Sequence, residues 1–120
     1  MKKQETGRMG EDLASQALRK KGYRIIERNY RCRFGEIDIV ASTAGCLVFV
    51  EVRSKTGSTY GTASESLTAG KKQRLTAAAM SYLESHDNLP ENWRIDFVGV
   101  DIDTTGSKPP VIEIIEDALG

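Results

Sequence analysis

The sequence predicts an α/β fold, a three-layer sandwich with a mixed central sheet and the element order αβββαββ. Three observations support this prediction. Two segments carry apolar residues at helical spacing, five shorter segments are rich in β-branched and aromatic residues, and the two kinds are interspersed along the chain. The 120 residues, 39% of them hydrophobic, suffice for a single domain over residues 1–120 with one modest core.

The two helices are expected over Thr6–Lys21 and from the N-cap Thr68 to Ser85. In the first, apolar residues recur every three or four positions, basic residues close the last turn, and Gly22 occupies the position of a left-handed C-cap. The second helix is expected to bury one stripe of apolar side chains against the sheet. This stripe consists of Leu75, Ala78, Ala79, Tyr82 and Leu83.

Five segments are predicted to be strands. Their ranges are Tyr23–Arg31, Phe34–Ala41, Cys46–Arg53, Arg94–Asp103 and Val111–Glu116. The second and third are separated by Ser42–Gly45 and are expected to form a hairpin. The segment Ser54–Leu67 is rich in Ser, Thr and Gly and shows no periodicity, so we expect a loop there that orders only around a ligand.

The net charge is zero, with 17 basic and 17 acidic residues, but the charges are unevenly distributed. Residues 1–35 hold ten Lys and Arg against four Asp and Glu, residues 36–85 hold five of each, and residues 86–120 hold two against eight. Such segregation can build one basic face on a neutral protein, which would suit a nucleic-acid partner. The alternative is that the two ends of the chain pair with each other.

The apolar segments are too short for a membrane protein. The longest apolar run, Leu47–Val50, falls far below the roughly 18 residues that a transmembrane helix needs. No apolar stretch of a secretory signal follows Met1–Lys3, so we expect a cytoplasmic protein. In that reducing compartment Cys32 and Cys46 are expected to stay free and partly buried. A single histidine, His86, leaves a Cys/His zinc site without enough ligands.

Charged and apolar residues alternate in the second and third predicted strands. Because side chains of a strand alternate between its faces, Glu36 and Asp38 are expected on one face, as are Glu51, Arg53 and Lys55. The apolar residues of the opposite face are Ile37, Ile39, Val50 and Val52. A two-residue turn between the strands places Asp38 opposite Glu51 and Glu36 opposite Arg53.

Two carboxylates facing each other across a strand pair repel and need a compensating cation. A divalent metal ion would supply it, and oxygen-only ligands suit Mg²⁺ or Mn²⁺ rather than zinc. Such ions activate water for attack on a phosphodiester. The alternative is a surface ion-pair network in which Arg53, Lys55 and other basic residues neutralise Asp38 and Glu51.

Five motifs spread over nearly the whole chain resemble the bacterial family called UPF0102 or YraN. They are Gly10-Glu11-Asp12-Leu13-Ala14, Gly35-Glu36-Ile37-Asp38, Phe49-Val50-Glu51-Val52-Arg53, Lys72-Gln73 with Ala79 and Tyr82-Leu83, and Arg94-Ile95-Asp96-Phe97-Val98. The central motif is similar to the PD-(D/E)-x-K nuclease signature. The resemblance implies a restriction-endonuclease-like fold close to that of archaeal Holliday junction resolvases.

The resemblance implies roles for particular residues. Asp38 and Glu51 would be metal ligands, and Glu11 a third acidic residue near the metal, with a helix-dipole charge at an N-terminus as its alternative. Glu36 would support the ligands or pair with Arg53. Basic and amide side chains at the start of the second helix would contact substrate phosphate, or would be ordinary solvated helix charges. The resemblance covers Lys72 and Gln73, and Lys71 and Arg74 join them as candidates because they are basic residues of the same first turns.

The sequence departs from the nuclease signature where the signature has lysine. Arg53 stands there, and a guanidinium with a pKa above about 12 cannot act as a general base. Arg53 can still hold a phosphate or stabilise a transition state, and Lys55 is a candidate for the ammonium role. The proline of the signature is replaced by Ile37.

The sequence therefore predicts a Mg²⁺- or Mn²⁺-dependent endonuclease acting on DNA, in particular on branched or junction DNA. Asp38, Glu51, Glu11, Arg53 and Lys55 are its candidate catalytic residues. One alternative is a non-catalytic nucleic-acid-binding module that has lost full activity, and another is a protein-interaction adaptor. Two symmetric cuts in a junction need two sites, so this function would imply a homodimer.

Overall fold

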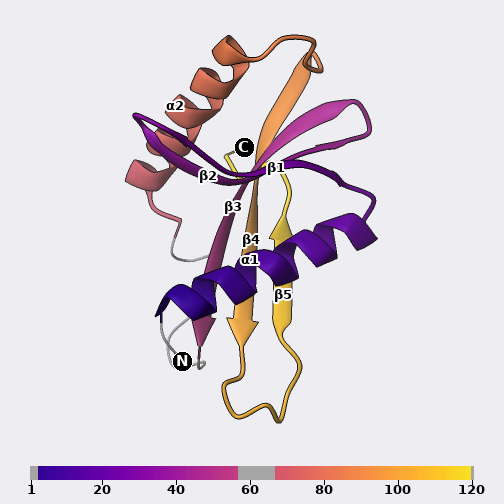
Figure 1. Ribbon diagram of the computed structural model, residues 1–120, viewed down its shortest axis with the longest axis vertical. Helices are drawn as coiled ribbons and strands as arrows, with labels where there is room; N and C mark the ends of the chain where they lie inside the picture. Colours follow the sequence, from indigo (N-terminus) through magenta and orange to yellow (C-terminus); the bar gives the residue numbers. More distant parts are fainter. Residues whose placement is uncertain (1–2, 57–66, 120) are drawn as a thin grey trace.

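The computed structural model describes residues 3–56 and 67–119, and within them the elements follow the predicted order (Figure 1). The elements are α1 (Lys3–Lys20), β1 (Arg24–Cys32), β2 (Gly35–Thr43), β3 (Cys46–Thr56), α2 (Ala69–Ser85), β4 (Asn92–Ile102) and β5 (Val111–Ile115). The five strands form one sheet in the order β1-β2-β3-β4-β5. β3 and β4 are parallel and the other neighbours are antiparallel, so the sheet is mixed as predicted.

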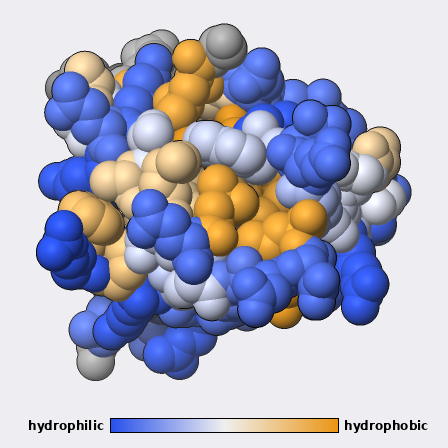
Figure 2. Space-filling view, turned by 90° about the horizontal axis from the view of Figure 1, so that it is seen from above, coloured by the Kyte–Doolittle hydropathy of each residue, from blue (hydrophilic) through white to orange (hydrophobic). Residues whose placement is uncertain are grey.

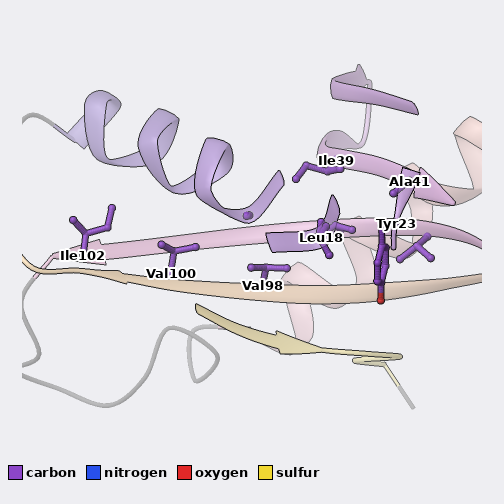
Figure 3. Close-up of a cluster of buried hydrophobic side chains, with 10 residues drawn as sticks. Leu18, Tyr23, Ile39, Ala41, Val98, Val100 and Ile102 are labelled. Atoms are coloured by element: carbon purple, nitrogen blue, oxygen red, sulfur yellow. The ribbon is translucent and has the colours of Figure 1, made fainter. Parts of the chain in front are cut away.

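The two helices cover opposite faces of the sheet and complete a three-layer sandwich (Figure 1). On one face, Ala14 and Leu18 of α1 pack against the middle strands, and Val98, Val100 and Ile102 of β4 point towards this helix (Figure 3). The buried residues of the other face lie against α2. They are Ile37, Val40, Leu47, Phe49, Leu75, Ala78, Ala79, Tyr82 and Ile95. The core is therefore divided into two layers by the sheet.

Local signals predicted where the turns lie. Gly22 has φ 98° and ends α1, as expected of a left-handed C-cap. Ala44 and Gly45 have φ 48° and 76° and form the turn between β2 and β3. Thr68 caps α2, since its Oγ1 accepts the backbone N–H of Lys71 at 3.3 Å. These hydrogen bonds and turns explain why the elements begin and end near their predicted positions.

Element ends differ from the sequence prediction most clearly at β3. This strand continues to Thr56, although residues 54–56 were expected in a loop. The reason is non-local, because β4 offers backbone partners along its length and pairs as far as Thr56↔Ile102. The remainder of the expected loop, residues 57–66, lies outside the described residues. Helix α1 begins at Lys3 rather than at Thr6.

The face of the molecule shown in Figure 2 is predominantly hydrophilic. Figure 2 looks down on the end that is uppermost in Figure 1, where apolar side chains lie in the middle of a hydrophilic surround. Cys32 and Cys46 are free and partly buried, as predicted. Among the described residues, neither helix has the length and apolar character required to cross a membrane.

Candidate metal centre

Asp38 interrupts the pairing of two central strands. β2 and β3 pair from Thr43↔Cys46 to Ile39↔Val50 and no further. Beyond this point the Asp38 Oδ2 accepts the backbone N–H of Val52 at 2.8 Å. The side-chain carboxylate thus accepts a hydrogen bond that a backbone carbonyl of β2 would accept in a continuous ladder. The expected register is confirmed, but the ladder ends before it reaches Asp38.

The side-chain alternation predicted for β2 is wrong at this position. Ile37 packs with the α2 layer, whereas Ile39 packs with the α1 layer, so the two residues do not share a face. The neighbouring strand β1 changes face at the same place, because Asn29 has a left-handed φ of 59°. Arg28 thus reaches α1, and Tyr30, two residues later, packs against α2.

Four carboxyl groups from three elements meet around Asp38. Oxygen atoms of Glu11, Glu36 and Asp38 lie within 4.8 Å of one another. The Glu51 carboxylate hydrogen-bonds to Asp38 from the other side. The structure therefore brings together all four acidic residues that the sequence singled out.

The electrostatics of this cluster are unfavourable in the absence of a cation. Burial, followed by the hydrogen bond and the charge of Glu51, raises the pKa of Asp38 from 3.8 to about 8. Burial and the charge of Asp38 likewise raise the pKa of Glu36. The nearby Arg53 acts in the opposite direction without cancelling these effects. Asp38, facing Glu51, therefore keeps a proton to a higher pH than an ordinary aspartic acid does.

Glu11 is held in place by β1. Its Oε1 accepts Arg28 Nε at 3.0 Å and Asn29 Nδ2 at 2.8 Å. Because α1 begins at Lys3, Glu11 lies two turns inside the helix, and the alternative of an N-terminal dipole charge is wrong. The acidic residue of the first turn is Glu5.

Gly10 sets the distance between α1 and the sheet at this site. A Cβ on Gly10 would overlap Oγ and Cβ of Ser54 on β3. Only glycine therefore lets the helix approach β3 closely enough to bring Glu11 to Asp38. Sequence reasoning quoted Gly10 as part of a motif and gave it no role, because its partner lies in a strand end that was expected to be a loop.

Two cavities meet at Asp38. The first, of about 220 Å³, holds Glu36, Asp38 and Glu51 together with the basic residues Lys71 and Arg74. The second, of about 570 Å³, has Asp38 in its wall again. Its other charged residues are Glu11, Arg53 and Lys55. Each cavity thus combines carboxylates with basic side chains.

The four candidate phosphate contacts on α2 separate into two pairs. Lys71 and Arg74, three residues apart, line the first cavity on the same side of the helix as the buried Leu75. Lys72 and Gln73 line neither of the two cavities at Asp38. The sequence prediction rested on the position of the four residues at the start of the helix and made no use of the predicted stripe, in which Leu75 lies one turn after Lys71.

Lys55 is positioned by a residue that the sequence analysis missed. Its Nζ lies 3.8 Å from the Oδ1 of Asp101, its direct neighbour in the parallel pairing of β3 with β4. The strand continues beyond Ser54, so Lys55 belongs to it. Only the β3–β4 register relates these two residues, and the sequence pattern contains no signal for a parallel register.

The alternative was an ion-pair network that neutralises Asp38 and Glu51, and the ion pairs of two nearby arginines belong instead to the neighbouring acids Glu11 and Glu36. Arg28 pairs with Glu11 at 3.0 Å, and Arg31 lies 3.5 Å from Glu36. The basic N-terminal third and the acidic C-terminal third of the chain form one ion pair among the described residues, Lys21 with Glu116 at 3.1 Å. The raised pKa of Asp38 shows that these contacts leave the centre of the cluster electrostatically strained.

The fold and this site define a class, the α/β sandwich domains that carry a carboxylate cluster at a break between two central strands. Comparison with known proteins then gives the family. Residues 10–100 match the model described as "Uncharacterised protein family UPF0102", and the chain belongs to this family. The family resemblance stated from the sequence is thereby confirmed.

Relatives with high identity cover most of the chain. A UPF0102 protein of Pelotomaculum thermopropionicum is 48% identical over 100 residues, covering 83% of each chain. One from Dehalococcoides mccartyi is 46% identical over 119 residues, covering 98% of this chain and 95% of the relative. One from Syntrophus aciditrophicus is 41% identical over 114 residues, covering 95% and 87%.

Proposed function

We propose that this protein is a metal-dependent endonuclease that hydrolyses phosphodiester bonds in DNA. One observation carries the proposal: Glu11, Glu36 and Glu51 converge on Asp38 at a break between strands, and basic residues line the same cavities. Carboxylates on a cavity wall can bind a metal ion, and basic side chains beside them can bind the phosphate of a substrate.

The residues of the cluster fit a hard divalent cation. All four donors are carboxylate oxygens, the ligands of Mg²⁺ and Mn²⁺. The raised pKa of Asp38 means that an added positive charge would relieve repulsion that the protein's own cations leave uncompensated. Asp38 and Glu51 would hold the ion, with Glu11 or Glu36 as a further ligand. A bound ion would supply Lewis-acid activation of water and of the phosphate.

The basic side chains have separate tasks in this proposal. Arg53 and Lys55 line the second cavity and would neutralise charge that develops on the scissile phosphate. Lys71 and Arg74 face Glu36 and Asp38 across the first cavity and would hold a neighbouring phosphate. Asp101 would orient Lys55.

The three-layer sandwich with its mixed sheet supports a restriction-endonuclease-like assignment, with the site at the interrupted strand pair. By this assignment hydrolysis would leave a 3′-hydroxyl and a 5′-phosphate. Branched DNA, such as a Holliday junction, would be a substrate. Two symmetric cuts in a junction would require a homodimer. The protein would act in the cytoplasm.

The first test is Mg²⁺ and Mn²⁺ binding by calorimetry. The wild type is compared with Asp38→Asn/Glu51→Gln, and the matched control is Asp87→Asn/Glu91→Gln, which neutralises two exposed acids away from the cluster. We expect binding in the wild type and the control and none in the cluster variant. Equal binding in all three proteins would contradict the assigned ligands.

The second test is cleavage. The wild type is incubated with Mg²⁺ or Mn²⁺ and with duplex, single-stranded, flapped and four-way DNA. We expect metal-dependent cleavage of at least one substrate that the cluster variant does not cleave. Absence of cleavage of every substrate at high enzyme concentration would refute the endonuclease proposal.

A second candidate function is a DNA-binding module without catalysis. Arg53 favours it, because arginine replaces the lysine of the nuclease signature and cannot take up a proton. This alternative predicts salt-dependent DNA binding that persists in EDTA and no cleavage. The variant Arg53→Lys separates the two: activity gained only on this substitution would identify a lost catalytic function.

A further inference from the structure

The turn between β1 and β2 places an aromatic ring beside the carboxylate cluster. Cys32 pairs with Gly35, so Arg33 and Phe34 are the two residues of the turn. The side chain of Phe34 is among the large exposed apolar ones, at 37%. It lines the first cavity together with Asp38. The ring therefore stands at the entrance to the acidic site.

Phe34 also borders a third cavity, on the other side of the turn. This cavity, of about 470 Å³, lies between Arg33 and Phe34 and the exposed side of α2, where Met80 and Glu84 line it. Figure 1 shows the β1–β2 turn beside α2, and a contact of 3.1 Å between Tyr30 Oη and Ser81 Oγ joins the strand to the helix. The ring thus separates two adjoining hollows, only one of which contains the carboxylates.

The surroundings of Phe34 carry charges of both signs: the first cavity holds the carboxylates of Glu36, Asp38 and Glu51, and basic side chains lie around the ring. The guanidinium of Arg33 lies 4.6 Å from the centre of the ring. Arg31, whose side chain is 80% exposed, stands at the base of the turn, and Lys71 and Arg74 line the first cavity opposite. An exposed aromatic ring with basic side chains nearby is a combination with which proteins bind single-stranded nucleic acid, through base stacking and phosphate contacts, and the carboxylates of the same cavity are the proposed metal ligands.

We propose that Phe34 stacks on an unpaired base next to the phosphate at the carboxylate cluster. The proposal rests on the proposed function and specifies its substrate class: DNA with an unpaired nucleotide at the cleavage position, such as a flap. In a continuous duplex each base is stacked on both neighbours and offers the ring no free face. The turn would therefore select DNA by the accessibility of a base and not by its identity.

The test is fluorescence anisotropy with two labelled DNAs, a duplex carrying a single-stranded flap and the matched continuous duplex, in EDTA and in Ca²⁺. Phe34→Ala is expected to weaken flap binding about tenfold and duplex binding less than about twofold. Phe34→Trp keeps a stacking ring and is expected to retain flap binding. The matched control is Ile26→Ala, since Ile26 is 46% exposed on β1 and lines none of the three cavities.

Equal losses on both DNAs, or no loss on the flap, would overturn the stacking role, as would a Phe34→Trp variant as weak as Phe34→Ala. Circular dichroism of each variant confirms that the fold is kept. If the wild type cleaves DNA and Phe34→Ala cleaves the flap as well as the wild type does, this inference fails and the endonuclease proposal stands. If nothing is cleaved but flap binding depends on Phe34, the endonuclease proposal fails and the stacking role stands.

Discussion

Two aspartates in the interior of the sheet, Asp38 on β2 and Asp96 on β4, have opposite environments. Asp96 is fully buried and accepts four hydrogen bonds, two from the Arg94 side chain, one from the Tyr23 hydroxyl and one from the Asp117 backbone N–H. Asp38 accepts one backbone N–H, from Val52, and otherwise faces carboxylates. The protein thus supplies Asp96 with a complete set of hydrogen-bond donors, and it does not supply such a set to Asp38.

The difference distinguishes a structural aspartate, Asp96, from the aspartate of the candidate site, Asp38. The Arg94 guanidinium lies 2.9 Å from Asp96, whose hydrogen bond is the main cause of the raised pKa of Arg94. Burial and Asp96 similarly raise the pKa of Tyr23. This network joins β4 to the end of α1 and to the segment after β5, so it stabilises the fold. A buried carboxylate placed among other carboxylates costs stability, and such sites concentrate where function requires them.

The largest expected effect is the loss of the Asp96 network. Asp96→Ala leaves Arg94 and Tyr23 without their partner in the interior and is expected to destabilise the protein by about 3–5 kcal/mol. Urea denaturation followed by circular dichroism measures the change. Asp96→Asn keeps the shape of the side chain and serves if the alanine variant does not fold. A change below about 1 kcal/mol would show that this network is not structural.

The next effect has the opposite sign. Asp38→Asn is expected to stabilise the metal-free protein at pH 8, by a few kcal/mol, because the folded protein no longer buries a strained acid. The pKa of Asp38 is about 8 in the folded state against an ordinary 3.8. Between these values the folded state binds the extra proton, so wild-type stability falls as pH rises, and the asparagine variant lacks this contribution.

Urea titrations at about pH 4, 6 and 8 therefore test both the sign and the size of the change in unfolding free energy. These pH values span the interval between the two pKa values of Asp38. The gain from Asp38→Asn should be small at the lowest pH, which lies close to the ordinary pKa of 3.8 so that the folded state binds little more proton than the unfolded state, and should grow with pH. Asp87→Asn, an exposed acid, is the control and should show no such trend. A destabilisation by Asp38→Asn that does not change with pH would contradict the comparison.

A bound divalent metal ion should supply the positive charge that Asp38 lacks in the protein and so raise the free energy of unfolding. Mg²⁺ or Mn²⁺ at about 100 times its dissociation constant is expected to stabilise the wild type by about 2.7 kcal/mol, through binding to the folded state alone. Asp38→Asn/Glu51→Gln should show no such gain, and Asp96→Asn should keep it. Thermal unfolding with and without the ion measures the difference. A gain that is equal in the wild type and the cluster variant would place the ion elsewhere.

The smallest effect is expected at the surface pair beside the Asp96 network. Lys21 and Glu116 are both about half exposed, with side-chain exposures of 48% and 49%. Solvent and salt screen such a pair, so Glu116→Gln should shift the melting temperature by less than about 2 °C. A larger shift would mean that the network around Tyr23, to which Glu116 also belongs, extends to the surface.

Local sequence signals predicted most of the fold. Periodicity gave both helices and all five strands, and turn residues gave the β2–β3 hairpin and its register. The proximity of the acidic residues was expected too, that of Asp38 and Glu51 from a strand pairing that a short turn determines and that of Glu11 from the family resemblance. These predictions succeed where the determining contacts are close in sequence.

The remaining features depend on contacts between distant segments. The change of face at Asp38 follows from the left-handed Asn29 of the adjacent strand, which strand alternation does not reveal. The position of Lys55 follows from Asp101 on a parallel strand some forty-six positions later in the chain, and parallel pairing has no turn to fix its register. The role of Asp96 in the fold likewise became visible only with Tyr23 and Asp117 beside it.

The contact of Gly10 with Ser54 has a consequence for ion selection. The carboxylates of Glu36, Asp38 and Glu51 are carried by the sheet, whereas that of Glu11 is carried by α1. The distance between the Glu11 carboxylate and the other three therefore depends on how closely α1 approaches β3. The absence of a Cβ at Gly10 permits this close approach. If the cluster binds a divalent ion as proposed, Gly10→Ala would move the carboxylate of Glu11 away from the other three without removing any of them, and the preference would change from Mg²⁺ towards the larger Ca²⁺.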